Sequence, residues 1–174
     1  MKGGIQKGTT ASTAESLKID KQVRTISRKI FEENDDLFSS ISFCFSKEEK
    51  QRHVGDDCFG FAPDGGAWFL DDHLVLVLEA KKQGKGGNAQ ERWFDNAVTA
   101  KFINPDVHYV TFCVGEGAQE AEVFGKLKRK AKLMMGNRFR FHLSKDGFTD
   151  WDVEEIIRNA VETILKENDD DNSK

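Results

Sequence analysis

Two carboxylates and a lysine have the types and the spacing that metal-assisted chemistry on a phosphate needs. Asp64 lies in a Gly-softened turn, and Glu79 and Lys81 follow the most apolar segment of the chain, residues 74–78. Alternate residues of a strand point to the same face, so Glu79 and Lys81 point together. If residues 67–70 and 74–79 form an antiparallel hairpin, the turn that carries Asp64 returns next to Glu79. Two converging carboxylates can hold a hard divalent cation, and a nearby lysine can stabilise charge that develops on a phosphate.

The elements that must position these side chains belong to an α/β fold, in which helices flank a mixed central sheet. Apolar residues at helical spacing predict helices over residues 16–33, 89–102, 120–135 and 150–167. Apolar runs predict strands over residues 41–45, 67–70, 74–78, 108–114 and 138–143, with residues 58–61 on the other side of the turn at 63–66. The order of helix, three antiparallel strands, helix, strand, helix, strand and helix implies a mixed sheet with helices on both sides.

The 174 residues have the length of one ordinary domain, and no internal repeat suggests a second. We expect a flexible segment over residues 1–16, a single folded domain over residues 17–167 and a disordered acidic tail over residues 168–174. No apolar run is long enough to span a membrane, so no membrane association is expected. Cys44, Cys58 and Cys113 form no CxxC pair and lie in apolar runs, which favours buried thiols in a reducing cytosol over a zinc site.

The distribution of charge says more about partners than the net charge of −4 does. Taken whole, a negative chain argues against nucleic-acid binding, because phosphate contacts require Lys and Arg. By segment, the net charge is +5 over residues 1–30, +3 over 81–104 and +6 over 120–145, against −5 over 31–57 and −7 over 146–174. We therefore expect the three basic stretches to form one DNA-facing side, with ordinary solvated helix faces as the alternative.

Two motifs in the middle of the chain have counterparts in a known family. Pro63-Asp64, followed by Glu79-Ala80-Lys81, resembles the active-site motif of the PD-(D/E)XK nuclease superfamily. Residues 79–85 (EAKKQGK) and 87–92 (GNAQER) closely resemble the EcoRI/MunI-like type II restriction endonucleases. The similarity covers about residues 60 to 95, and the remaining element order is compatible with that fold.

The resemblance implies a division of roles at the site. Asp64 and Glu79 would bind Mg²⁺ with help from the backbone carbonyl of Ala80, and Lys81 would be the catalytic lysine. A glutamate near the N-terminus often assists the metal site in this superfamily, and both Glu32 and Glu33 are candidates.

The resemblance also implies that the segment before and at the start of the second helix reads bases in the major groove of double-stranded DNA. Asn88 can pair with an adenine edge, Arg92 can donate to purine acceptors, and Glu91 can accept from exocyclic amines. In the relatives this segment reads an inner AATT, so the predicted site is a palindrome that contains AATT, with a bare four-base site as an alternative. The implied DNA contacts are Lys82, Gln83, Lys85, Gly87, Asn88, Ala89, Glu91 and Arg92.

These expectations describe a homodimeric, Mg²⁺-dependent type II restriction endonuclease in the cytoplasm of a prokaryote or associated with a phage. A palindromic site matches a two-fold dimer, and such an enzyme would be paired with a cognate DNA methyltransferase. Two alternatives stay open. One is another nuclease of the superfamily, such as a junction resolvase or a repair nuclease, and the other is a non-catalytic DNA-binding protein on the same fold.

Overall fold

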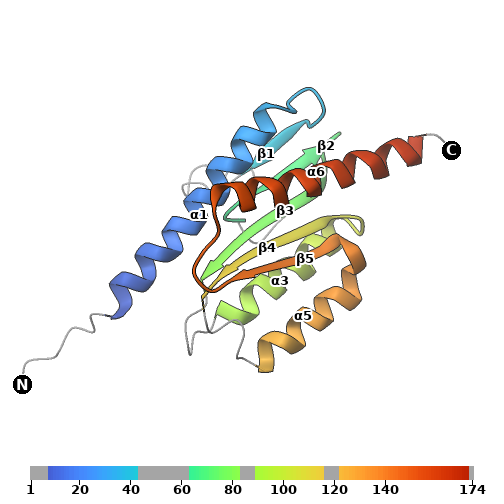
Figure 1. Ribbon diagram of the computed structural model, residues 1–174. Coiled ribbons are helices and arrows are strands. Elements are labelled where there is room, and N and C mark those ends of the chain that lie inside the picture. Colours follow the sequence, from blue (N-terminus) through green and yellow to red (C-terminus); the bar gives the residue numbers. More distant parts are fainter. Residues whose placement is uncertain (1–7, 43–62, 83–88, 116–121, 173–174) are drawn as a thin grey trace, which may run out of the picture.

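The computed structural model describes residues 8–42, 63–82, 89–115 and 122–172 (Figure 1). Within these residues, five strands form one sheet in the order β1-β2-β3-β4-β5, which is also their order along the chain. The strands are β1 (Ser40–Ser42), β2 (Gly66–Leu70), β3 (His73–Lys82), β4 (His108–Val114) and β5 (Phe139–Ser144). The helices are α1 (Gly8–Glu32), α3 (Ala89–Ile103), α5 (Glu122–Met135) and α6 (Asp150–Asn172), with a 3-10 turn (Gly136–Arg138) before β5.

The sheet is mixed, as the sequence predicts. β1, β2 and β3 pair antiparallel, whereas β3, β4 and β5 pair parallel, because helices α3 and α5 carry the chain back between them. A two-residue turn joins β2 to β3, with Leu70 paired to His73. Its central residues Asp71 and Asp72 have φ of 48° and 64°, the left-handed values that such a turn requires and that Asp tolerates.

Two helical layers cover the two faces of the sheet (Figure 1). Helices α1 and α6 pack side by side on one face, over a core that includes Trp68, Leu76 and Phe112. Helices α3 and α5 pack on the other face, over a core that includes Trp93 and Tyr109. The buried indole N–H of Trp68 donates to the Ser27 hydroxyl at 3.0 Å, so the polar group of the largest buried residue on the α1 face is satisfied.

Most predicted elements are confirmed, and two helices are longer than predicted. Helix α1 begins at Gly8 rather than near residue 16, and α6 continues to Asn172, through most of the segment predicted as a disordered tail. Extending an existing helix fixes one further residue for each hydrogen bond gained, without the cost of nucleation. Polar residues at the ends can therefore stay helical when the middle of the helix is well packed. The predicted strand residues 43–45 and the segment 58–61 lie outside the described residues.

The helices that carry the three basic stretches do not all cover the same face of the sheet. Helix α1 lies on the face opposite α3 and α5 (Figure 1), beside acidic α6. Lys29 of α1 pairs with Glu154 of α6 at 3.2 Å, and Arg158 of α6 pairs with Glu33 at 2.6 Å. Part of the N-terminal charge therefore holds two helices together.

None of the described helices combines the length and the apolar character that crossing a bilayer requires.

Candidate active site

Lys81 binds two carboxylates at the end of β3. Its Nζ lies 2.8 Å from Oδ2 of Asp64 and 2.5 Å from Oε1 of Glu79. The Glu79 side chain is 1% exposed, whereas Asp64 and Lys81 are each 22% exposed, so the cluster has a buried end and an end that solvent reaches. The three residues that the sequence singled out thus meet at one place.

The turn before β2 brings Asp64 to β3 because Gly65 fits where no larger residue does. The Gly65 N–H donates to the carbonyl of Leu78 at 2.9 Å, one residue before Glu79. A Cβ at Gly65 would lie 2.6 Å from Cγ1 of Val23 in α1 and 2.8 Å from the Leu78 carbonyl oxygen. Arg24 of α1 donates from Nε to the backbone carbonyl of Asp64 at 3.3 Å, so α1 and β3 together fix this turn.

The electrostatics of Glu79 follow from its burial. Burial raises its pKa to about 7, the charge of Lys81 opposes that rise, and the charge of Asp64 adds to it. Asn96 of α3 donates from Nδ2 to Glu79 Oε1 at 3.3 Å, which favours the ionised form. Oε2 of Glu79 is buried and has no hydrogen-bond partner among the described residues. A buried, unsatisfied carboxylate oxygen is costly unless a ligand completes it.

Lys81 is the charged partner in this cluster. Burial lowers its pKa, but the two adjacent carboxylates and their hydrogen bonds raise it further, to well above its usual range. Lys81 is therefore a cation at neutral pH, which suits charge stabilisation rather than proton abstraction.

Asp20 of α1 is a third acid, on which the charges of Asp64 and Lys81 act, and sequence reasoning missed it. Burial and the charge of Asp64 raise its pKa to about 7, while Lys81 and Arg24 oppose the rise. Its Oδ1 is buried and has no hydrogen-bond partner among the described residues. The available signal was an acid next to Ile19 and Val23, two residues of the buried stripe of α1.

Glu32 and Glu33, the candidates that the sequence offered for an accessory acid, lie at the other end of α1. Twelve residues separate Glu32 from Asp20, which is about 18 Å along a helix axis. Glu33 pairs with Arg158 of α6, and Glu32 is exposed to solvent. Among the α1 acids whose side chains are described, Asp20 is the one on whose pKa the charges of Asp64 and Lys81 act.

The predicted DNA-contacting residues are described only in part. Lys82 is half-buried as the last residue of β3, and Ala80, between Glu79 and Lys81, is buried toward the α1 and α6 layer. The backbone of residues 89–92 forms the first turn of α3, where the sequence predicted the helix to begin. Gln83, Lys85, Gly87 and Asn88 lie outside the described residues, as do the side chains of Ala89, Glu91 and Arg92.

The donor set at the site fits a hard cation in its chemistry. Asp64 and Glu79 offer carboxylate oxygens, and Oε2 of Glu79 is unpartnered among the described residues. In the described part of the chain, no group of three or more His, Cys, Asp and Glu side chains is placed to hold a metal ion. Water and substrate oxygens would therefore have to complete the coordination, as is usual for Mg²⁺.

No family model, no curated protein and no solved structure matches this chain. Function is therefore inferred from the geometry of the site and from the sequence motifs.

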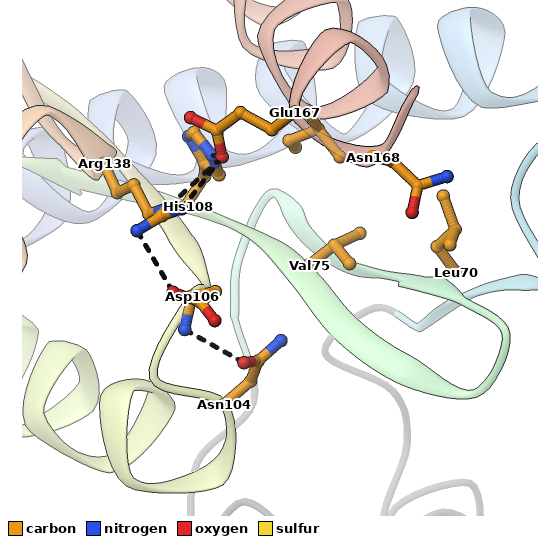
Figure 2. A pocket seen from close by; sticks show the side chains of 9 residues that line it. Leu70, Val75, Asn104, Asp106, His108, Arg138, Glu167 and Asn168 are labelled. Atoms are coloured by element: carbon orange, nitrogen blue, oxygen red, sulfur yellow. Dashed lines mark hydrogen bonds and ion pairs between the residues drawn. The ribbon is translucent and has the colours of Figure 1, made fainter. Parts of the chain in front are cut away.

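A separate polar cavity of about 200 Å³ lies at the opposite end of the strands from the cluster, where β3 and β4 begin (Figure 2). Glu167 Oε2 lies 3.0 Å from Nε2 of His108 and accepts a hydrogen bond from Arg138, which also pairs with Asp106 at 3.1 Å. Burial lowers the pKa of His108. Since these charged groups satisfy one another, the network fastens α6 to the sheet. The cavity is lined by Leu70, Val75, Asn104, Asp106, His108, Arg138, Ile164, Glu167 and Asn168.

Proposed function

We propose that this chain is a Mg²⁺-dependent endonuclease of the PD-(D/E)XK superfamily that cuts double-stranded DNA. The observation that carries the proposal is the cluster in which Lys81 binds both Asp64 and Glu79 at the end of the central strand. The cluster follows a Pro-Asp turn and an antiparallel hairpin within a mixed sheet, an order compatible with that superfamily.

Each residue of the cluster has a role that its surroundings support. Asp64 and Glu79 would hold Mg²⁺ with the Ala80 carbonyl, and bound Mg²⁺ would polarise the scissile phosphate and lower the pKa of water. Lys81, cationic at neutral pH, donates hydrogen bonds to the phosphate oxygen on which negative charge develops. Asp20, with a pKa of about 7, can take up a proton near neutral pH. Hydrolysis would leave a 5′-phosphate and a 3′-hydroxyl.

Sequence specificity is assigned to the start of α3, by resemblance to type II restriction endonucleases. Asn88, Glu91 and Arg92 would read base edges in the major groove, within a palindromic site that contains AATT. A homodimer would present two such helices to the two half-sites, and a cognate DNA methyltransferase would protect the host sequence. We assign the enzyme to the cytoplasm of a prokaryote or to a phage.

The deciding experiment is digestion of a DNA of known sequence with Mg²⁺, followed by sequencing of the ends. We expect discrete cuts at AATT-containing sites in plain duplex. Cutting only at branched junctions would instead indicate a resolvase, and specific binding without cutting would indicate a non-catalytic protein.

The variant Asp64→Asn should lower the cutting rate by at least about a thousandfold while specific binding stays measurable. Its carboxylate is needed to hold the cation, and a single essential electrostatic group contributes on this scale. Asp36→Asn is the matched control, because Asp36 is exposed and far along the chain from the cluster. Persistent cutting by Asp64→Asn would refute the assignment of the cluster, and loss of cutting by Asp36→Asn would point to a general effect of charge.

A further inference from the structure

Helix α5 and the strand that follows it carry a concentration of positive charge. Residues 123–145 contain eight Lys or Arg and no Asp or Glu. Arg129, Lys130 and Lys132 are exposed, and none of them forms an ion pair within the described residues. Lys132 donates instead to the side-chain amide oxygen of Asn137.

Cations on the opposite face are arranged differently. Lys29 of α1 pairs with Glu154 of α6, Arg158 pairs with Glu154 within α6, and Lys166 lies 3.9 Å from Glu162. Like charges three or four residues apart repel along a helix, as in the pairs Arg129–Lys132 and Lys128–Lys132. This repulsion destabilises the helix, in a chain whose net charge is −4. Binding of a polyanionic partner would offset that loss of stability.

The cationic helix lies on the same side of the sheet as the candidate active site. Helix α5 packs beside α3, the helix that contacts Glu79 through Asn96 (Figure 1). Nζ of Lys128 lies 4.5 Å from the ring centre of Phe141, which anchors this lysine against β5. The charges of Lys128 and Lys81 both act on the buried thiol of Cys113, so the α5 charge reaches the neighbourhood of the cluster.

We propose that the exposed cationic face of α5, centred on Arg129 and Lys130, binds the phosphate backbone of the duplex that the active site cuts. This inference rests on the proposed function in taking the polyanion to be duplex DNA. The surface supplies affinity and orientation and reads no bases, since backbone contacts are independent of sequence. The rise along a helix is about 1.5 Å per residue. The cations of α5 therefore form a surface that can contact neighbouring phosphates of one DNA strand.

The test compares two double variants that remove the same charge from opposite faces. Arg129→Gln/Lys130→Gln alters α5, and Lys29→Gln/Lys166→Gln is the control on α1 and α6. Binding to a 20-base-pair duplex containing AATT is measured without divalent cation from 50 to 300 mM KCl, with circular dichroism to verify folding. We expect the α5 variant to lose about tenfold in affinity at low salt and its log–log salt slope to fall by about 2, while the control keeps the slope of the unsubstituted protein.

Three results would overturn the inference. One is an unchanged slope in the α5 variant, and a second is an equal loss in the control, which would reflect the net charge of the protein rather than the place of the cations. The third is binding of the unsubstituted protein to anionic vesicles but not to duplex. Because binding is measured without the metal, an α5-dependent slope in a protein that does not cut would support the surface and refute the proposed cleavage. Arg129→Lys keeps the positive charge and should retain most of the salt slope, which would confirm that charge is responsible for the binding.

Discussion

At the scale of single residues, the side chain of Asn96 connects helix α3 to the buried carboxylate of Glu79. The hydrogen bond from Asn96 stabilises the ionised form of Glu79, whose pKa burial has raised to about 7. Helix α3 begins with the proposed base-reading segment. A shift of that helix would therefore change the pKa of Glu79 through the hydrogen bond from Asn96.

The variant Asn96→Leu should move the acidic limb of the cleavage pH profile to higher pH. Without the hydrogen bond the pKa of Glu79 rises further, so a smaller fraction is ionised near pH 6.5. Loss of about 1 kcal/mol predicts a several-fold lower rate at pH 6.5 and a rate near that of the unsubstituted enzyme at pH 9. The measurement is the initial rate of cutting from pH 5.5 to 9.5.

Asp95→Ala, on the exposed side of the same helix, is the control and should leave the profile in place. An equal loss of rate at every pH in Asn96→Leu would indicate a structural role instead.

The core of the candidate site could be predicted from sequence because its parts are local. Glu79 and Lys81 are two residues apart on one strand and so share a face of it. The hairpin that brings Asp64 next to Glu79 is closed by a short turn. Asp20 and Asn96 could not be predicted, because they reach the cluster through the packing of α1 and α3 on the sheet. Asp20 and Asp64 are more than forty residues apart in the chain, so no sequence spacing predicts that the charge of one acts on the other.

At the scale of elements, the close approach of α1 to the turn before β2 determines where Asp64 lies. Gly65 occupies the space between Val23 of α1 and Leu78 of β3, so this contact has no room for a side chain. The turn, the helix and the strand are therefore fixed together.

Gly65→Ala should lower the free energy of unfolding by about 1–3 kcal/mol, the usual cost of overpacking a core, and should lower the cutting rate as well. The added methyl must push Val23 or the Leu78 backbone away, since both lie under 3.0 Å from it. Urea denaturation and the rate at saturating Mg²⁺ measure the two effects.

Gly125→Ala is the paired control. It lies within α5, where, among the described residues, a Cβ would meet only an Arg129 nitrogen at 3.6 Å, so the substitution should stabilise the protein by about 0.5–1 kcal/mol. A Gly65→Ala protein as stable and active as the unsubstituted one would contradict the tight contact.

The types of the elements followed from periodicity, but their placement on the two faces did not. Apolar runs such as residues 74–78 predict a central strand, and β3 is that strand. The charge of a segment, in contrast, does not say which face its helix will cover. The basic α1 lies beside acidic α6, where Lys29 and Glu154 attract one another, rather than beside the basic α5.

At the scale of the whole molecule, the acids of the site make stability depend on pH. The pKa of Asp20 is about 7 in the folded chain, against an ordinary value of 3.8. Below that ordinary value Asp20 is protonated in both states and has no effect. As the pH rises toward 7 the unfolded chain ionises first, so the folded state loses stability across this window.

Asp20→Asn should therefore raise the Tm of the metal-free protein at pH 8 and leave it unchanged at pH 3.5. We expect roughly 2–4 °C, the shift that about 1 kcal/mol produces in a domain of this size, because partial exposure of Asp20 screens its charge. Added Mg²⁺ should raise the Tm of the unsubstituted protein more at pH 8 than at pH 5, where Glu79 is protonated. Differences of equal size at all pH values would contradict the assigned pKa values.

The strand order of the sheet also has a consequence for how the chain assembles during synthesis. Because spatial order follows chain order, each strand can join the edge left by the one before it as the chain leaves the ribosome. Glu79 is enclosed only after β4 and α3 have formed, and α1 gains its partner only when α6, made last, docks beside it. A chain synthesised only as far as β3 therefore lacks the enclosed carboxylate on which the proposed cleavage depends, and any cutting activity would require at least α3 and β4.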